Sequence, residues 1–226
     1  MNEQGLDAVG IAQLFARPVA VGVAAASMYD QPPFAEEALV VARAVEPRRR
    51  EFAAGRACAR LALAELGFAP AAIAIGPDRA PVWPADAVGS ITHCEGFCCA
   101  VAARKGAVAG LGIDAEAAEP LEPASLRLVL RAEERAAHAP LPGIAGLDWP
   151  KLAFSAKEAF YKAWRPLTGL DLTFQDVAID FCVDGSFQVR LAPSPTLHTA
   201  ATPWAFTGRW RLFAGRVCTG VTALPV

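Results

Sequence analysis

Two acidic residues stand two positions apart at the end of a short apolar run, VAGLGIDAE, which spans Val108 to Glu116. In an extended strand, residues i and i+2 point to the same face, so the carboxylates of Asp114 and Glu116 are predicted to project toward one spot. Two like charges so close resist ionising together unless a cation lies between them. Mg²⁺ suits that position, because it takes one or two protein carboxylates and completes its shell with waters and substrate phosphates. The alternative is that Asp-Ala-Glu is only a solvated turn after a buried strand.

A second group of charged residues lies on a strongly marked helix. Asp148 is a good N-cap, a proline falls in the first turn, and the helix is predicted to run to Arg165, before Pro166. Residues three and four positions apart share a face of a helix. One polar stripe is therefore predicted to contain Ser155, Glu158, Lys162 and Arg165.

A third group lies on a helix predicted from Pro47 to Leu66, which starts at a proline and ends before Gly67. Its basic residues Arg49, Arg56 and Arg60 share a face at spacings of seven and four. A run of this kind is most often a solvated basic face, and the residues alone do not exclude that reading.

A β-hairpin is predicted from the segments VGSITH, which ends at His93, and FCCAVAAR, with a turn between them. Alternation places Ser90 and Thr92 on one face of the first strand. A proline-rich loop containing Arg79 and Trp83 leads into it. With the strand that carries Asp114, three strands are expected in meander order. His93 is either structural or a donor to a bound phosphate.

The remaining segments complete an α+β pattern. A strand is predicted over residues 19–28, and helices over residues 34–45 and 124–138. The second of these helices carries a basic stripe, Arg127, Arg131 and Arg135, beside apolar residues. From residue 174 onward the pattern is strands only, broken by a loop from Pro193 to Pro203. Each half therefore reads as helices packed on a small, mostly antiparallel sheet, although no internal sequence repeat is visible.

Composition excludes several classes of protein. The 226 residues are 54% hydrophobic, which is enough for a sizeable core, and the net charge of -2 gives no global basic field for nucleic acid. The six cysteines show no paired CxxC spacing, so they are expected to be reduced thiols. The acidic N-terminal segment does not resemble a signal peptide, and no apolar run reaches 18 residues. A cytoplasmic protein without membrane contact is expected.

Four segments in this order resemble the 4′-phosphopantetheinyl transferases: REFAAGRACAR, PVWPADAVGSITHC, GIDAE and FSAKEAFYKA. The chain is most similar to the longer, monomeric, two-lobed type that includes the enterobactin and surfactin synthetase activators. This resemblance implies two similar α+β lobes, residues 1–108 and 109–226, with the active site at their interface. It also implies transfer of 4′-phosphopantetheine from coenzyme A to a serine of an acyl or peptidyl carrier protein, with release of adenosine 3′,5′-bisphosphate.

The resemblance implies roles for individual residues. Mg²⁺ would be held by Asp114, Glu116 and Glu158, and Glu158 would also accept the proton of the serine. Lys162 would hold the pyrophosphate, with Lys157 assisting. The 3′-phosphate of coenzyme A would be held by Arg48, Arg56 and His93. Thr92 and Arg79 are further candidate contacts, although relatives often carry a lysine in the loop where Arg79 is the cation.

The same acidic cluster suits two other functions. One is a different Mg²⁺-dependent phosphoryl or nucleotidyl transferase, although the GxxxxGK[ST] phosphate loop is absent. The other is an inactive module that binds coenzyme A or a carrier protein, which would be expected to have lost a carboxylate. The sequence does not choose among fatty-acid, polyketide and nonribosomal-peptide carriers. A docking surface for an acidic carrier is expected on the basic stripe of residues 124–138.

Overall fold

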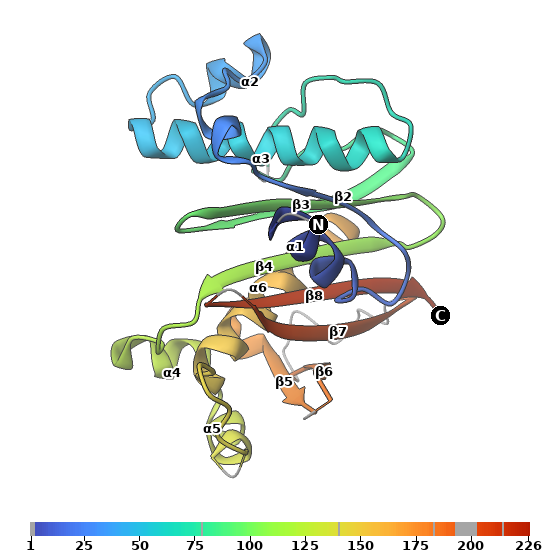
Figure 1. Ribbon diagram of the computed structural model, residues 1–226. Helices are drawn as coiled ribbons and strands as arrows, with labels where there is room; N and C mark the ends of the chain where they lie inside the picture. The colour runs from blue at the N-terminus through green and yellow to red at the C-terminus, as the bar shows by residue number, and fades with distance from the viewer. Residues whose placement is uncertain (1–2, 78, 140, 183, 193–202, 214) are drawn as a thin grey trace.

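A computed structural model describes residues 3–77, 79–139, 141–182, 184–192, 203–213 and 215–226. Two antiparallel sheets lie one above the other, and each carries a long helix (Figure 1). The predicted α+β class with two helix-on-sheet lobes is confirmed. Most of the predicted loop from Pro193 to Pro203 lies outside the described residues.

The N-terminal lobe has a three-stranded sheet in the order β1-β3-β2. Its strands are β1 (Ala20–Val23), β2 (Ala87–Cys94) and β3 (Phe97–Arg104). Its helices are α2 (Ala35–Val40) and α3 (Glu46–Glu65), while α1 (Glu3–Ala12) lies beside the contact between the lobes (Figure 1). The predicted hairpin and arginine helix are confirmed as β2–β3 and α3. The first strand is shorter than predicted, because β1 is an edge strand whose pairing with β3 stops at Val23. Helix α2 is also shorter than predicted and ends at Val40.

The C-terminal lobe has a five-stranded sheet in the order β4-β8-β7-β6-β5. Its strands are β4 (Gly110–Ala117), β5 (Val177–Phe181), β6 (Ser186–Leu191), β7 (Trp204–Phe213) and β8 (Arg216–Pro225). The long helix α6 (Trp149–Thr168) packs on β4 and β8. The carboxylate of Asp148 accepts a hydrogen bond from the Lys151 N–H at 3.0 Å, as expected of an N-cap.

Two helical predictions need correction. Helix α6 continues through Pro166 to Thr168, where Gly169 ends it in the left-handed conformation with φ of 70°. The helix expected over residues 124–138 is broken into α4 (Leu126–Val129) and α5 (Ala132–His138). The break lies at Leu130, whose backbone is extended and whose side chain is buried in the core. The chain thus leaves the helical conformation at Leu130, and this places the Leu130 side chain in the core.

The expected three-strand meander is wrong, because β4 pairs with β8 and not with β3. Strands β2 and β4 nevertheless lie against each other across the contact between the lobes. Two backbone N–H groups of β4, those of Ile113 and Ala115, donate to the hydroxyl oxygens of Ser90 and Thr92 at 3.1 and 3.0 Å. Side-chain hydroxyls therefore replace a backbone ladder at this contact.

A hydrophobic cluster also crosses from one lobe to the other. It joins residues following α1, residues of β3, and residues of β4 and β8, with Leu14, Val101, Ile113 and Cys218 among its buried members. The expected lobe boundary between residues 108 and 109 lies in the connection from β3 to β4 and stays a prediction, because this shared core extends across it.

Each lobe also contains a buried glutamate that joins a short helix, a long helix and a separate backbone segment. In the N-terminal lobe, Glu37 of α2 accepts hydrogen bonds from the backbone N–H of Phe34 and of Ile73, and from Arg60 of α3. Its side chain is fully buried. A buried charge of this kind is stable only when it is paired and hydrogen-bonded, which Glu37 is.

The C-terminal lobe repeats the arrangement. Glu134 of α5 accepts from the backbone N–H of Arg131 and of Ile179, and from the Lys157 ammonium of α6. Both segments contain the sequence AEE, at residues 35–37 and 132–134. The two lobes thus share a local repeat that is too short to recognise in the sequence alone.

None of the helices in the described part of the chain is long and apolar enough to cross a bilayer.

A close contact between α6 and β4 depends on Gly112. A Cβ atom there would lie 1.8 Å from the carbonyl oxygen of Ala159 on α6. We predict that Gly112→Ala lowers the free energy of unfolding by about 1–3 kcal/mol or more, because helix and strand must separate. The control is Gly143→Ala, since a Cβ at Gly143 meets no atom within 4 Å. Chemical denaturation measures both. Equal stability of the two variants would contradict this account.

Candidate active site

A cavity of about 660 Å³ lies between the lobes. It is lined by residues of α3, β2, β4, α6 and the loop before β2. Eight of the predicted site residues line it: Arg48, Arg56, Arg79, Thr92, His93, Asp114, Glu158 and Lys162. The other two, Glu116 and Lys157, are not among the described lining residues.

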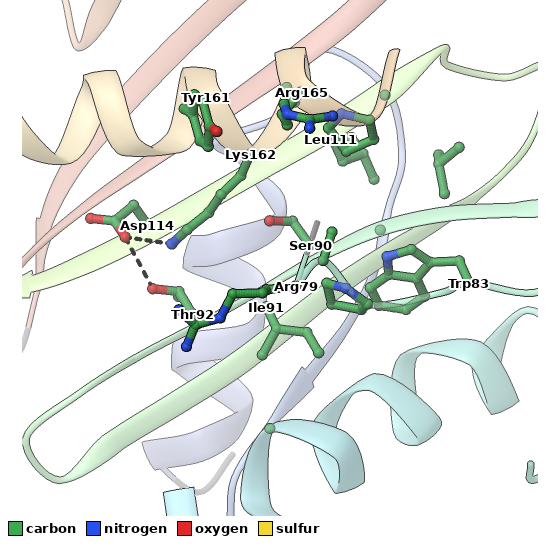
Figure 2. A pocket seen from close by; sticks show the side chains of 18 of the residues that line it. Arg79, Trp83, Ser90, Ile91, Thr92, Leu111, Asp114, Tyr161, Lys162 and Arg165 are labelled. Atoms are coloured by element: carbon green, nitrogen blue, oxygen red, sulfur yellow. Dashed lines mark hydrogen bonds and ion pairs between the residues drawn. The ribbon is translucent and has the colours of Figure 1, made fainter. Parts of the chain in front are cut away.

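The centre of the site is the carboxylate of Asp114 on β4, which is 4% exposed. Lys162 of α6 and Thr92 of β2 point toward it from opposite sides (Figure 2). The ammonium of Lys162 donates to Oδ1 at 2.7 Å, and the hydroxyl of Thr92 donates to the same oxygen at 3.3 Å. The other oxygen, Oδ2, is buried and has no hydrogen-bond partner among the described residues.

The neighbouring ionisable groups respond to this buried charge. Burial lowers the pKa of Lys162, but the charge of Asp114, their hydrogen bond and the charge of Glu158 together raise it above its usual value. Burial raises the pKa of Glu158, and Asp114 adds to the increase while Lys162 opposes it. Glu158 therefore holds its proton more tightly than an ordinary glutamate.

Glu116 lies at the edge of this group. Its carboxylate is 3.5 Å from the ammonium of Lys151. Burial raises its pKa, and repulsion from Asp114 raises it further. The charge of Asp114 thus acts on Glu116, as their spacing on one strand predicts.

A further cation besides Lys162 would stabilise the carboxylates of Asp114, Glu116 and Glu158. Among the described residues, no three His, Cys, Asp or Glu side chains are gathered closely enough to hold a metal ion, and Lys162 pairs with Asp114 instead. However, the unpartnered Oδ2 and the raised pKa values of Glu116 and Glu158 are what a hard cation would relieve. The residue types therefore suit Mg²⁺, although the three carboxylates are not gathered around one point in this structure.

One end of the cavity carries a cationic group. The guanidinium of Arg48 lies 2.8 Å from Nε2 of His93, and Glu51 lies 3.6 Å from both residues. Because Arg48 can only donate, Nε2 accepts, which places the imidazole proton on Nδ1. Burial lowers the pKa of His93 and Arg48 lowers it further, although Glu51 opposes the change. Arg48 and His93 share the negative charge of Glu51. An anion that bound here would add negative charge beside both side chains.

Arg56 of α3 approaches the same cavity from a buried position. It is 5% exposed, its Nε donates to the carbonyl of Ile73 at 2.9 Å, and its guanidinium lies over the ring of Phe52. Burial lowers the pKa of Arg56 to about 10, while Glu37 opposes that change. Arg56 remains charged at neutral pH, but it is poorly compensated.

Arg79 lies in the loop before β2 and has φ of 67°, a left-handed conformation that costs energy for a residue with a side chain. Its side chain is exposed and extends along the cavity opposite Trp83 (Figure 2).

The structure does not place Lys157 with the other predicted phosphate ligands. Its ammonium is 1% exposed, pairs with Glu134, and donates to the carbonyls of Val129 and Phe174. Three acceptors use all three of its N–H groups. We therefore replace the phosphate-binding role of Lys157 with a structural one, which joins α6 to α4, α5 and the segment before β5.

Several lining residues were not predicted as site residues. They are Glu51, Trp83, Ser90, Tyr161 and Arg165. The alternation along β2 already places Ser90 on the face of Thr92. Similarly, Arg165 belongs to the polar stripe of α6. The positions of Glu51 and Tyr161 depend on how the lobes pack and leave no comparable signal.

Comparison with known proteins agrees with this geometry. Residues 35–103 match the model of the 4′-phosphopantetheinyl transferase N-terminal domain, and residues 110–218 match that of the 4′-phosphopantetheinyl transferase superfamily. The chain is 39% identical to 4′-phosphopantetheinyl transferase PptT of Mycobacterium tuberculosis, over 93% of this chain and 96% of that one. It is 44% identical to 4′-phosphopantetheinyl transferase Svp of Streptomyces mobaraensis, over 83% and 77% of the two chains.

A solved holo-(acyl-carrier-protein) synthase from Bacillus anthracis aligns with 53% of this chain and 98% of its own, at 17% identity and a TM-score of 0.40. The two family models together with the 39% identity across nearly the full length of both chains lead to one conclusion: this chain belongs to the 4′-phosphopantetheinyl transferase superfamily and is of its long type.

Proposed function

We propose that the chain transfers the 4′-phosphopantetheine group of coenzyme A to a serine of an apo carrier protein and releases adenosine 3′,5′-bisphosphate. The observation that carries this proposal is the cavity between the lobes, with a buried carboxylate and a lysine at its centre and Arg48, Arg56 and the imidazole of His93 at one end. These two groups of side chains match coenzyme A, because it carries a pyrophosphate and a separate 3′-phosphate.

The cationic end would bind the 3′-phosphate. Arg48 can leave the imidazole of His93 and donate to phosphate oxygens, and a protonated His93 can donate beside it. Nε of Arg56 donates to Ile73, and within the described part of the chain no hydrogen bond uses its other N–H groups, which can therefore donate to the ligand.

Mg²⁺ would be held by Asp114, Glu116 and Glu158, and when bound it would neutralise charge on the pyrophosphate oxygens. Lys162 adds a positive charge from α6 at the same place. Thr92 fixes the orientation of Asp114 by donating to Oδ1.

Glu158 is suited to accept the proton of the attacking serine. It lines the cavity, and its raised pKa makes it a stronger base than an exposed glutamate. The proton of the serine hydroxyl would pass to Glu158 as the oxygen attacks the β-phosphorus. The bond between the β-phosphorus and the leaving adenosine 3′,5′-bisphosphate breaks in the same displacement.

The carrier protein would dock beside α4, which follows β4 at the end that carries Asp114 and Glu116 (Figure 1). Arg127 and Leu128 are exposed there, and Leu128 is 65% exposed. The predicted stripe is smaller than expected, because Arg131 is bonded to Glu133 and the Gln175 carbonyl, and Arg135 to the Leu130 carbonyl. We therefore place the docking contact on Arg127 and Leu128.

We further propose a cytoplasmic monomer. All six cysteines are free thiols, as is usual in a reducing compartment. The site is formed by two lobes of a single chain, so it needs no second copy.

The two alternative functions are less well supported. An inactive module would not need the three carboxylates that this chain retains, and the matching family models are those of the transferases.

The first test removes the charge of Asp114. We predict that Asp114→Asn slows transfer by roughly 10²-fold or more, because it weakens both the Mg²⁺ site and the pair with Lys162. The measurement is the addition of phosphopantetheine to an apo carrier, followed by intact mass. Glu119→Gln, which removes a charge from an exposed carboxylate, is the matched control. Full activity of Asp114→Asn with Mg²⁺ as the metal would refute the assignment.

A second test concerns the 3′-phosphate. Charge-assisted hydrogen bonds are worth about 1.5–3 kcal/mol, so we predict that Arg56→Ala weakens coenzyme A binding by roughly 10- to 100-fold. Binding of 3′-dephospho-coenzyme A should change little. Calorimetry with both ligands measures the ratio of affinities. An equal loss for the two ligands would show that Arg56 does not bind the 3′-phosphate.

A third test reverses the charge of Arg127. We predict that Arg127→Glu raises the KM for an acidic carrier by roughly three- to tenfold at low salt, with a smaller effect at high salt because exposed charges are screened. The KM for coenzyme A should be unchanged. Arg43→Glu, an exposed arginine of the N-terminal lobe, provides the control. If both variants have the same carrier KM, the docking surface lies elsewhere.

A further inference from the structure

Glu37 is a buried charged residue that the proposed reaction does not use. Its side chain is fully buried, yet it lies on the short helix α2, outside the described lining of the cavity. It accepts hydrogen bonds from the N–H of Phe34 at 2.9 Å, the N–H of Ile73 at 2.8 Å and the guanidinium of Arg60 at 2.6 Å. A carboxylate with this set of donors is held in one position.

One of these bonds leads directly to the cavity. The backbone of Ile73 is held at both of its polar groups, because its N–H donates to Glu37 and its carbonyl accepts from Nε of Arg56 at 2.9 Å. Ile73 lies in a segment without regular secondary structure between α3 and β2. No helix or strand ladder therefore determines where its carbonyl points, and the bond to Glu37 is the polar contact that fixes its N–H.

The charge of Glu37 also acts on Arg56. Arg56 loses hydration in its buried position, and the negative charge of Glu37 partly compensates for that loss. Arg60 follows Arg56 by about one turn of α3 and pairs with Glu37 at 14% side-chain exposure, while its own charge lowers the pKa of Arg56. Glu37 thus orients Arg56 through Ile73 and favours its charged form from a distance.

We propose that Glu37 is a positioning residue for Arg56, and that it sets the preference of this protein for coenzyme A over ligands without the 3′-phosphate. The proposal rests on the proposed function, in which Arg56 binds that phosphate. Glu37 itself touches no part of the ligand. Its effect is transmitted through the Ile73 peptide, by two hydrogen bonds in series.

The C-terminal lobe supplies a matched control. Glu134 accepts hydrogen bonds from a backbone N–H, that of Ile179, and from a cation of the long helix, as Glu37 does. The carbonyl of Ile179, however, faces His138 at 3.4 Å, and neither residue is among the described lining of the cavity. Glu134→Gln therefore disturbs the same kind of buried network without reaching Arg56.

The experiment is a double-mutant cycle read by calorimetry. The affinities for coenzyme A and for 3′-dephospho-coenzyme A are measured for the wild type, Glu37→Gln, Arg56→Ala, the double variant and Glu134→Gln. We expect Glu37→Gln to reduce the preference for coenzyme A by roughly three- to tenfold, the effect of one hydrogen bond. Glu134→Gln should leave the preference within about twofold of the wild type, as an unconnected site does. In the Arg56→Ala background, Glu37→Gln should have no further effect on the preference.

The outcomes separate the inference from the function it rests on. If Arg56→Ala removes the preference and Glu37→Gln leaves it intact, the positioning role is wrong and the phosphate assignment stands. If Arg56→Ala leaves the preference intact, both are wrong. A reduction of the preference by Glu37→Gln that persists in the Arg56→Ala background, or an equal reduction by Glu134→Gln, also overturns the inference. Should Glu37→Gln fail to fold, Glu37→Asp takes its place in the cycle, because the shorter carboxylate keeps the charge but cannot reach Phe34 and Ile73 together.

Discussion

The carboxylate of Asp114 is buried at the contact between the lobes, with two hydrogen bonds on one oxygen and none from the described residues on the other. Placing a charge there is costly unless it is paired, and the pairing comes from both sides of the contact, from Thr92 of one lobe and Lys162 of the other. The same contact explains why β2 and β4 do not form a ladder. The hydroxyl groups of Ser90 and Thr92 accept hydrogen bonds from the β4 backbone, and residues of both strands line the cavity.

The two lobes share one local arrangement of helices and buried charges. A short helix that begins with AEE is joined to a long helix by a buried glutamate that pairs with a cation of the long helix, and the long helix packs against a strand glycine. In the N-terminal lobe the glycine is Gly22, where a Cβ would lie 2.1 Å from the Cys58 carbonyl, and in the C-terminal lobe it is Gly112. The lobes differ in what they add to this frame. Arg56 lines the cavity from α3, whereas Glu158 and Lys162 line it from α6, so the N-terminal lobe contributes a cation and the C-terminal lobe a carboxylate beside a lysine.

Local signals in the sequence predicted the elements better than their pairing. Helix α3 and the start of α6 were recognisable from proline and N-cap residues, and alternation placed Ser90 and Thr92 on one face of β2. The partner of β4 could not be predicted in this way, because β8 is about a hundred residues away and an apolar strand pairs as well with either neighbour. The different positions of Lys157 and Lys162 follow from helix geometry: five residues correspond to a rotation of about 140°, so only Lys162 shares the face of Glu158. The break between α4 and α5 depends on the tertiary contacts of Leu130 and Glu134, which local propensity does not contain.

We propose that the buried carboxylate of Asp114 binds a metal ion through Oδ2, the oxygen that has no hydrogen-bond partner among the described residues. Thermal melting of the protein without coenzyme A tests it, with Mg²⁺ added against NaCl of matched ionic strength. A ligand that binds only the folded state raises Tm with its concentration. We predict that the Tm of the wild type rises with Mg²⁺ in this way, whereas that of Asp114→Asn does not respond to Mg²⁺. The same Mg²⁺-dependent rise in both proteins would contradict the account, because the metal would then bind without Asp114.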